Sequence, residues 1–128
     1  MPHFPHFFNE KGQFIDFKLQ YSPRTYLGYL KYCNLQLIPI IDKILSSSAT
    51  PPIILLMSDH GFREFSKPVD PKYYFMNFNA IHLPDQKYDA WYDGVSNLNQ
   101  FRILLNQQYK QDLPLLRDST ILLTYIDF

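Results

Sequence analysis

The residues best suited to chemistry are a neighbouring carboxylate and imidazole, Asp59 and His60, which follow a short apolar run. A carboxylate oxygen and an imidazole nitrogen together are suitable ligands for Zn²⁺ or Mn²⁺. Gly61 comes next, and it allows a sharp backbone turn, so the two side chains need not point in opposite directions. The residues alone leave two interpretations open: a divalent-metal site, or a polar loop that caps the following segment.

The element that must position this pair is the apolar run at residues 53–57. The run is unbroken and lies between turn-forming residues, which predicts a strand buried on both faces, as in the centre of a parallel sheet covered by helices. Open α/β sheets place their ligand sites at the carboxyl ends of strands, because loops can converge there. Asp59 and His60 are expected at such an end.

A long helix is predicted before this strand. Ser22 is a good N-cap residue, and Pro23 suits the first helical position, where a missing N–H costs nothing. Apolar residues then recur at three- and four-residue spacing from Leu27 to Leu45. Pro39 interrupts the pattern and is expected to kink the helix or divide it.

The rest of the chain continues in the same style. It suggests a second strand at residues 75–83 and a last strand at 121–126. Between them a second helix is expected, capped by Ser96 or Asn97, with apolar residues from Leu98 to Tyr109. The predicted fold class is therefore α/β, a partial and mostly parallel sheet flanked by helices. We expect one partial domain over residues 1–128.

Composition narrows the classes of function. Twelve basic and twelve acidic residues cancel, so the chain shows no electrostatic footprint for nucleic acid or an anionic membrane. The single cysteine, Cys33, excludes an internal disulfide and a zinc site built from several cysteines. No apolar run approaches the roughly 18 residues that span a bilayer, and the first residues lack the pattern of a signal peptide. Nothing in these residues reveals the localisation.

Four blocks of the sequence together resemble one known family. They are residues 57–63 (Met-Ser-Asp-His-Gly-Phe-Arg), 3–8 (His-Phe-Pro-His-Phe-Phe), 78–84 (Phe-Asn-Ala-Ile-His-Leu-Pro), and 95–102 (Val-Ser-Asn-Leu-Asn-Gln-Phe-Arg) with 105–106 (Leu-Asn). The blocks resemble the C-terminal part of the alkaline phosphatase and sulfatase superfamily. The nearest branch contains lipoteichoic acid synthases, phosphoethanolamine transferases and bacterial membrane proteins called sulfatase-like. The resemblance spans nearly the whole chain in the expected order.

The resemblance implies roles for particular residues. Asp59 and His60 match the pair that binds a divalent metal (Zn, Mn or Mg), which polarises a phosphoryl or sulfuryl oxygen and activates a Thr, Ser or formylglycine nucleophile. His6 matches a histidine that contacts the transferred group, and His3 lies close to it in the sequence with a less definite role. Arg63 can pair with an anionic substrate in a bidentate manner or bridge to a loop carboxylate.

The family's nucleophile lies far upstream of these blocks, and two protein ligands are fewer than a tight zinc site needs. We therefore expect the metal-binding part of a phosphate- or sulfate-ester hydrolase or transferase, inactive by itself. If the parent protein resembles its relatives, its catalytic domain faces outward from a bacterial membrane. A parallel sheet that lacks its first strands leaves an open edge, which predicts a homodimer through that edge.

Two alternatives remain at this point. The chain can be a non-catalytic α/β binding or interaction module that retains the fold. It can also be a small self-contained enzyme whose metal site uses His3, His6, Asp59 and His60.

Overall fold

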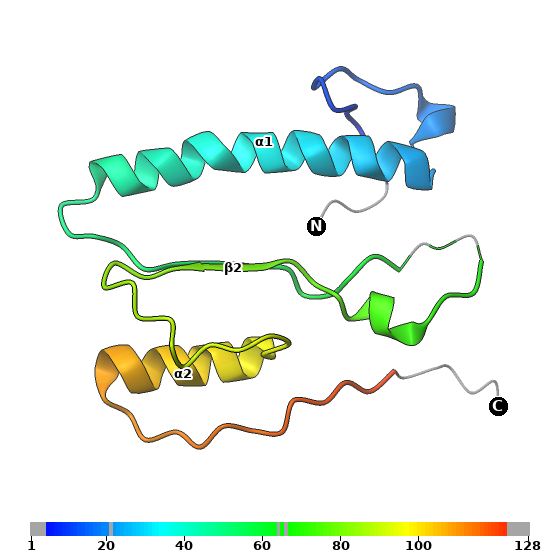
Figure 1. Cartoon of the computed structure of the whole chain (residues 1–128). Helices are drawn as coiled ribbons and strands as arrows, with labels where there is room; N and C mark the ends of the chain where they lie inside the picture. The colour runs from blue at the N-terminus through cyan, green and yellow to red at the C-terminus, as the bar shows by residue number, and fades with distance from the viewer. Residues whose placement is uncertain (1–4, 21, 64, 66, 123–128) are drawn as a thin grey trace. The chain divides into compact units, whose positions relative to one another are not determined.

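The structure is a computed structural model that describes residues 5–20, 22–63, 65 and 67–122. Along the chain its elements are η1 (Phe17–Leu19), α1 (Pro23–Ser47), β1 (Ile54–Met57), η2 (Pro71–Tyr74), β2 (Asn79–His82) and α2 (Asn97–Tyr109), where η is a 3₁₀ helix (Figure 1). The chain forms two compact units, Met1–Pro84 and Asp85–Phe128. The expectation of one partial domain over residues 1–128 stays a prediction.

The predicted mostly parallel sheet flanked by helices is wrong. The described residues contain one sheet of two strands, β1 and β2, which pair antiparallel with Ile54 opposite His82 and Met57 opposite Asn79. All four residues of β1 are half-buried rather than enclosed on both faces. An unbroken apolar run indicates that a strand is buried to some degree, but it carries no information on the direction of the partner strand. Over the described residues, the fold is a small mixed one of two α-helices and an antiparallel pair of strands.

Helix α1 begins as the sequence predicted. The Ser22 side chain accepts a hydrogen bond from the Thr25 N–H at 3.2 Å, and Pro23 occupies the first turn. The helix is not divided at Pro39, which lies inside its 25 residues. Because proline has no N–H, this position lacks one helical hydrogen bond. The remaining turns on both sides hold the helix together as one element.

The apolar face of α1 is incompletely covered. All of its residues are described, and Tyr26 is the only buried one. Leu27 and Ile40 are 59% and 55% exposed. A 25-residue helix is about 37 Å long, whereas a four-residue strand spans about 13 Å. Two such strands cannot shield the length of this helix, which leaves apolar surface open in the first unit.

In the second unit, two asparagines of α2 hold the segment that follows the helix. Asn99 donates to the Leu116 carbonyl (2.7 Å) and accepts from the Leu116 N–H (2.9 Å). Asn106 makes the same pair of bonds with Leu113, at 2.9 and 2.8 Å. Each amide therefore acts toward the backbone as a neighbouring strand would. Between them the Arg102 guanidinium donates to the Pro114 carbonyl at 3.0 Å.

The two described residues of the last predicted strand do not form a strand. Residues 121 and 122 adopt no regular secondary structure, and residues 123–126 lie outside the described part of the chain. The segment before them is extended but is held by α2 side chains, so its apolar residues did not need a strand partner to be ordered.

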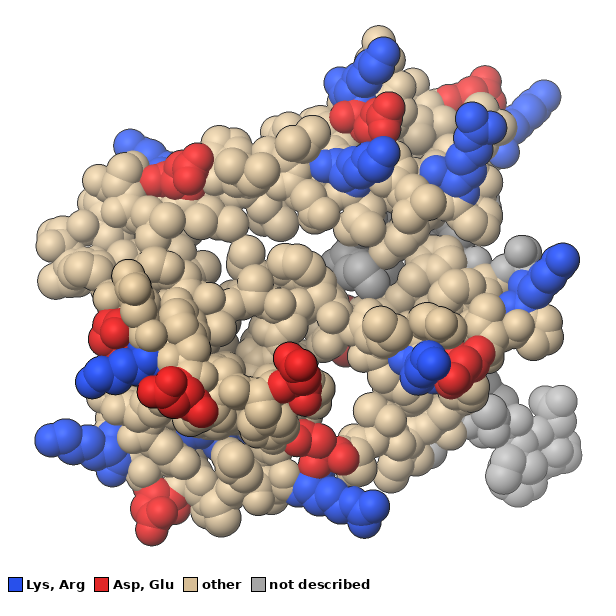
Figure 2. Space-filling view, in the orientation of Figure 1, with Lys and Arg blue, Asp and Glu red and all other residues tan. Residues whose placement is uncertain are grey.

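Charge and hydropathy agree with the composition. Within the described residues, no helix combines the length and apolarity needed to cross a bilayer. On the face shown in Figure 2, basic and acidic side chains are interspersed rather than gathered by sign. No strongly basic patch appears on that face.

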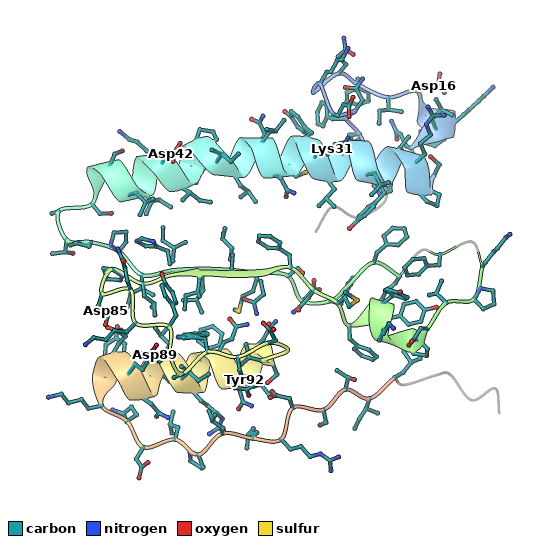
Figure 3. The ribbon with its side chains drawn as sticks, in the orientation of Figure 1. Asp16, Lys31, Asp42, Asp85, Asp89 and Tyr92 are labelled. Carbon is teal, nitrogen blue, oxygen red and sulfur yellow. The ribbon has the colours of Figure 1, made fainter. Side chains whose placement is uncertain are left out.

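The start of α2 depends on one acidic side chain. Asp118 accepts hydrogen bonds from the Ser96 N–H (3.0 Å), the Asn99 amide (2.9 Å) and the hydroxyl of Tyr92, which Figure 3 labels. Hydrogen bonding from Ser96, then from Tyr92, lowers the pKa of Asp118 from 3.8 to about 2. The ionised carboxylate is thus the form that holds this junction.

The hydrogen bonds of Asp118 at the start of α2 are expected to break only at strongly acidic pH. Because the folded pKa of Asp118 lies below its ordinary value, its contribution to stability is complete above pH 3.8 and is lost as the pH falls through about 2. The Ser96 amide resonance, followed by NMR during acid titration, should report this transition. Asp118→Asn keeps the shape but cannot ionise, so its Ser96 amide should lack the transition. A Ser96 amide that titrates near pH 3.8 in the unsubstituted protein would contradict the assignment.

Candidate functional site

The structure brings the side chains of Asp59 and His60 together directly after β1. Asp59 Oδ2 lies 3.5 Å from His60 Nε2. The Asp59 side chain is 71% exposed and the His60 side chain 21% exposed. The two polar atoms therefore lie close together, and solvent reaches both side chains.

A backbone contact fixes the orientation and the tautomer of His60. Its Nδ1 lies 2.6 Å from the carbonyl oxygen of Gly61. A carbonyl oxygen only accepts, so Nδ1 carries the hydrogen, and in the neutral ring Nε2 keeps its lone pair. Metal-binding histidines commonly donate their other N–H to a backbone carbonyl in this way. His60 Nε2 lies next to the Asp59 carboxylate, where it is an ion-pair partner when the ring is protonated and a second acceptor when the ring is neutral.

The spacing of the pair fits a divalent metal. Two ligand atoms at the usual bond lengths of a tetrahedral zinc ion lie roughly 3.4 Å apart, and the observed separation of Asp59 Oδ2 and His60 Nε2 is 3.5 Å. Among the described residues, however, no group of three or more His, Cys, Asp or Glu side chains is suitably placed to hold a metal. This pair would supply two of the four ligands of a tetrahedral ion, and any remaining ligands would have to come from elsewhere.

The Asp59 carboxylate is ionised at neutral pH. Partial burial raises its pKa, but hydrogen bonding to backbone N–H groups and the neighbouring His60 outweigh this effect and leave the pKa below 3.8. The carboxylate therefore needs no deprotonation before it binds a cation near neutral pH.

Gly61 is required for a reason other than the expected sharp turn. Among the described glycines, positive φ angles occur at Gly12 and Gly94 and not at Gly61. The Gly61 N–H donates to the Tyr74 carbonyl at 2.9 Å. A Cβ atom at Gly61 would overlap the Tyr73 carbonyl oxygen and lie 3.0 Å from the backbone nitrogen of Met76. The absence of a side chain lets the two backbone segments approach closely.

His6 is buried inside an aromatic cluster at the start of α1. It is 1% exposed, and its ring lies 5.5 Å from that of Tyr26 and 6.1 Å from that of Tyr29. Its Nδ1 lies 3.3 Å from Thr25 Oγ1. The Tyr26 ring also packs on Phe62, at 4.3 Å, so the cluster adjoins the loop that carries His60. A contact between His6 and a transferred group remains a prediction.

The other predicted site residues lie in different settings. Arg63 is exposed on the loop after the Asp59–His60 pair. His82 lies in β2, opposite Ile54. His3 lies outside the described residues, so its proposed role is not addressed. For the self-contained enzyme, the three described members of its proposed metal site, His6, Asp59 and His60, form no such group.

Two residues near the pair were missed by reasoning from the sequence. Ser58 and Asn77 hydrogen-bond to each other at the junction of β1 and β2, with Asn77 Nδ2 2.9 Å from the Ser58 carbonyl oxygen. The available signal was positional, since Ser58 directly follows the first predicted strand and Asn77 is a polar residue near the start of the second. That signal becomes useful only when the antiparallel pairing is known.

Comparison with models of protein families, with curated proteins and with solved structures finds no match. The resemblance to the alkaline phosphatase and sulfatase superfamily rests on its motif blocks and remains a prediction.

Gly61→Ala is expected to destabilise the loop after β1. The added methyl group meets backbone atoms, which cannot rotate away, and overpacking of this kind costs about 1–3 kcal/mol. Gly28→Ala is the matched control, because its Cβ would make only an ordinary 3.4 Å contact and alanine favours a helix by up to about 1 kcal/mol. Thermal unfolding should show a lower midpoint for Gly61→Ala and an equal or higher one for Gly28→Ala. Equal midpoints for both variants would show that the close approach at Gly61 is not tight.

Proposed function

We propose that this chain is the metal-binding portion of a phosphate- or sulfate-ester hydrolase or transferase of the sulfatase-like kind. Asp59 and His60 are the proposed ligands of a divalent ion, which can be Zn²⁺, Mn²⁺ or Mg²⁺. The observation that supports this proposal is the convergence of Asp59 Oδ2 and His60 Nε2 at 3.5 Å, with the opposite ring nitrogen held by a backbone carbonyl. Both atoms accept, and a cation satisfies both at once.

Each residue has a distinct part in this proposal. A bound divalent ion supplies Lewis-acid polarisation of an ester's phosphoryl or sulfuryl oxygen. Asp59 contributes negative charge, while His60 contributes a neutral nitrogen whose direction is set by Gly61. Arg63, exposed on the same loop, can bind two anionic oxygens of the substrate through its planar guanidinium. His6 can take part only if its cluster with the two tyrosines opens.

These 128 residues are proposed to be inactive alone. The motif blocks imply a nucleophile supplied by polypeptide upstream of them. Two protein ligands also bind a metal more weakly than the three or four of established zinc sites. The proposal is therefore a weak metal site that other polypeptide completes.

A non-catalytic interaction module is the second candidate. It is favoured by the uncovered apolar positions of α1 and by the narrow sheet, whose strands β1 and β2 pair only with each other among the described residues. A module of this kind would bind its partner without any dependence on Asp59 or His60.

Metal titration separates the two candidates. Calorimetry with Zn²⁺ and Mn²⁺ is expected to show weak binding by the full chain, and Asp59→Ala and His60→Ala should each abolish it, because one remaining ligand cannot form a chelate. Asp42→Ala is the control, since it removes an exposed carboxylate from α1 and should leave binding unchanged. Equal affinities for all four proteins would sink the metal proposal.

A turnover assay tests the expectation that the chain is inactive alone. The purified chain should hydrolyse neither an aryl phosphate nor an aryl sulfate. Hydrolysis that disappears with EDTA would show that these residues are sufficient for catalysis.

The sheet also suggests a partner. We infer that two copies of the chain pair through a free sheet edge, because β1 has four apolar residues and none of the charges or prolines that protect edge strands. Light scattering should show a dimer, and Leu55→Lys should shift it toward monomer. Leu35→Lys makes the same change on α1, away from the sheet, and should leave the dimer unchanged. A monomeric unsubstituted chain would rule out this dimer.

A further inference from the structure

We infer that Ser58 and Asn77 are positioning residues that hold Asp59 and His60 in their metal-binding geometry. This inference rests on the proposed function for its consequence, but its structural content stands on hydrogen bonds around the pair. Ser58 is 6% exposed, whereas the Asp59 side chain next to it is 71% exposed. A buried anchor thus adjoins an exposed ligand.

The anchor replaces one rung of the antiparallel ladder. The register that pairs Met57 with Asn79 continues to Ser58 and Phe78, and the Ser58 N–H donates to the Phe78 carbonyl at 2.9 Å. In a regular rung the Phe78 N–H would donate back to the Ser58 carbonyl. Instead it donates to Ser58 Oγ at 2.7 Å, and the Ser58 carbonyl accepts from Asn77 Nδ2 at 2.9 Å.

This substitution lets the chain leave the strand without losing hydrogen bonds. The Ser58 carbonyl turns to the Asn77 amide, so the peptide that leads into Asp59 need not follow the direction of β1. The Ser58 hydroxyl uses its hydrogen for the His60 carbonyl, at 3.3 Å, and its lone pairs for Phe78. The hydroxyl therefore spans the turn on which both proposed ligands lie.

The far side of the pair is anchored as well. The Gly61 N–H donates to Tyr74, and the Gly61 carbonyl accepts from His60 Nδ1. Asp59 and His60 are thus two residues between two buried points, Ser58 and Gly61. Loss of the first anchor should let the His60 carbonyl and ring move together, which changes the distance from Nε2 to the Asp59 carboxylate.

Variants at the two positions test this role with calorimetry and with a spectroscopic signature. Ser58→Ala removes the hydroxyl, and Asn77→Leu keeps the shape but removes the amide. Each should weaken Zn²⁺ binding by about 10–100-fold, the usual effect of losing an outer-shell partner, and alter the visible spectrum of bound Co²⁺. Ser58→Thr keeps the hydroxyl and should restore affinity and spectrum. Ser46→Ala and Asn34→Leu, which change the same residue types on α1, should have no effect.

Nitrogen chemical shifts of the His60 ring, measured without metal and while the ring is neutral, provide a second readout. The unsubstituted chain should show the Nδ1–H tautomer, and Ser58→Ala should shift the population toward Nε2–H. Folded variants that keep both the tautomer and the Zn²⁺ affinity would overturn the positioning role and leave the proposed function intact. A chain that shows the tautomer shift but binds no Zn²⁺ would overturn the proposed function and keep the positioning role. If Asn77→Leu fails to fold, the milder Ser58→Ala decides the matter.

Discussion

The hydroxyl of Ser58 occupies the place of a backbone carbonyl in the ladder between β1 and β2, and the local architecture depends on that exchange. A regular rung would carry the strand direction onward and alternate the following side chains above and below the sheet. With the rung made by a side chain, the main chain turns out of the sheet while its polar groups remain satisfied. A neighbouring carboxylate and imidazole can then meet on one side, which consecutive residues of an extended strand cannot do.

Gly61 and Phe62 also hold the turn that follows Ser58. Close backbone contact at Gly61 holds the segment around η2 against the turn, and the Phe62 ring packs at a tilt on Tyr26 at the start of α1. The turn that carries Asp59 and His60 is therefore held by contacts with the helix as well as with the sheet. In contrast, most of α1 beyond this contact is poorly covered. The first unit combines a well-anchored turn with an apolar surface that its own short strands cannot enclose.

Local signals predicted both α-helices and the two strands that pair, but they did not predict how those strands pair. Ser22, Pro23 and Ser96 mark helix starts because capping depends on residues within a few positions. The parallel sheet was wrong because strand direction depends on where the chain returns, which residues 53–57 do not encode. The adjacency of Asp59 and His60 suggested a shared site, but Ser58 and Asn77 are far apart in sequence, and their relation appears only once the strands are paired.

The asparagine contacts of α2 have a consequence for sequence variation. At Leu116 and Leu113, the hydrogen bonds from Asn99 and Asn106 involve the backbone N–H and C=O groups of these leucines. Because these hydrogen bonds involve backbone atoms, they do not depend on the side chains at positions 113 and 116, and many residue types could occupy those positions. Proline is the exception, because it lacks the N–H that each asparagine oxygen accepts. Pro114 sits between them at no cost, since only its carbonyl is used.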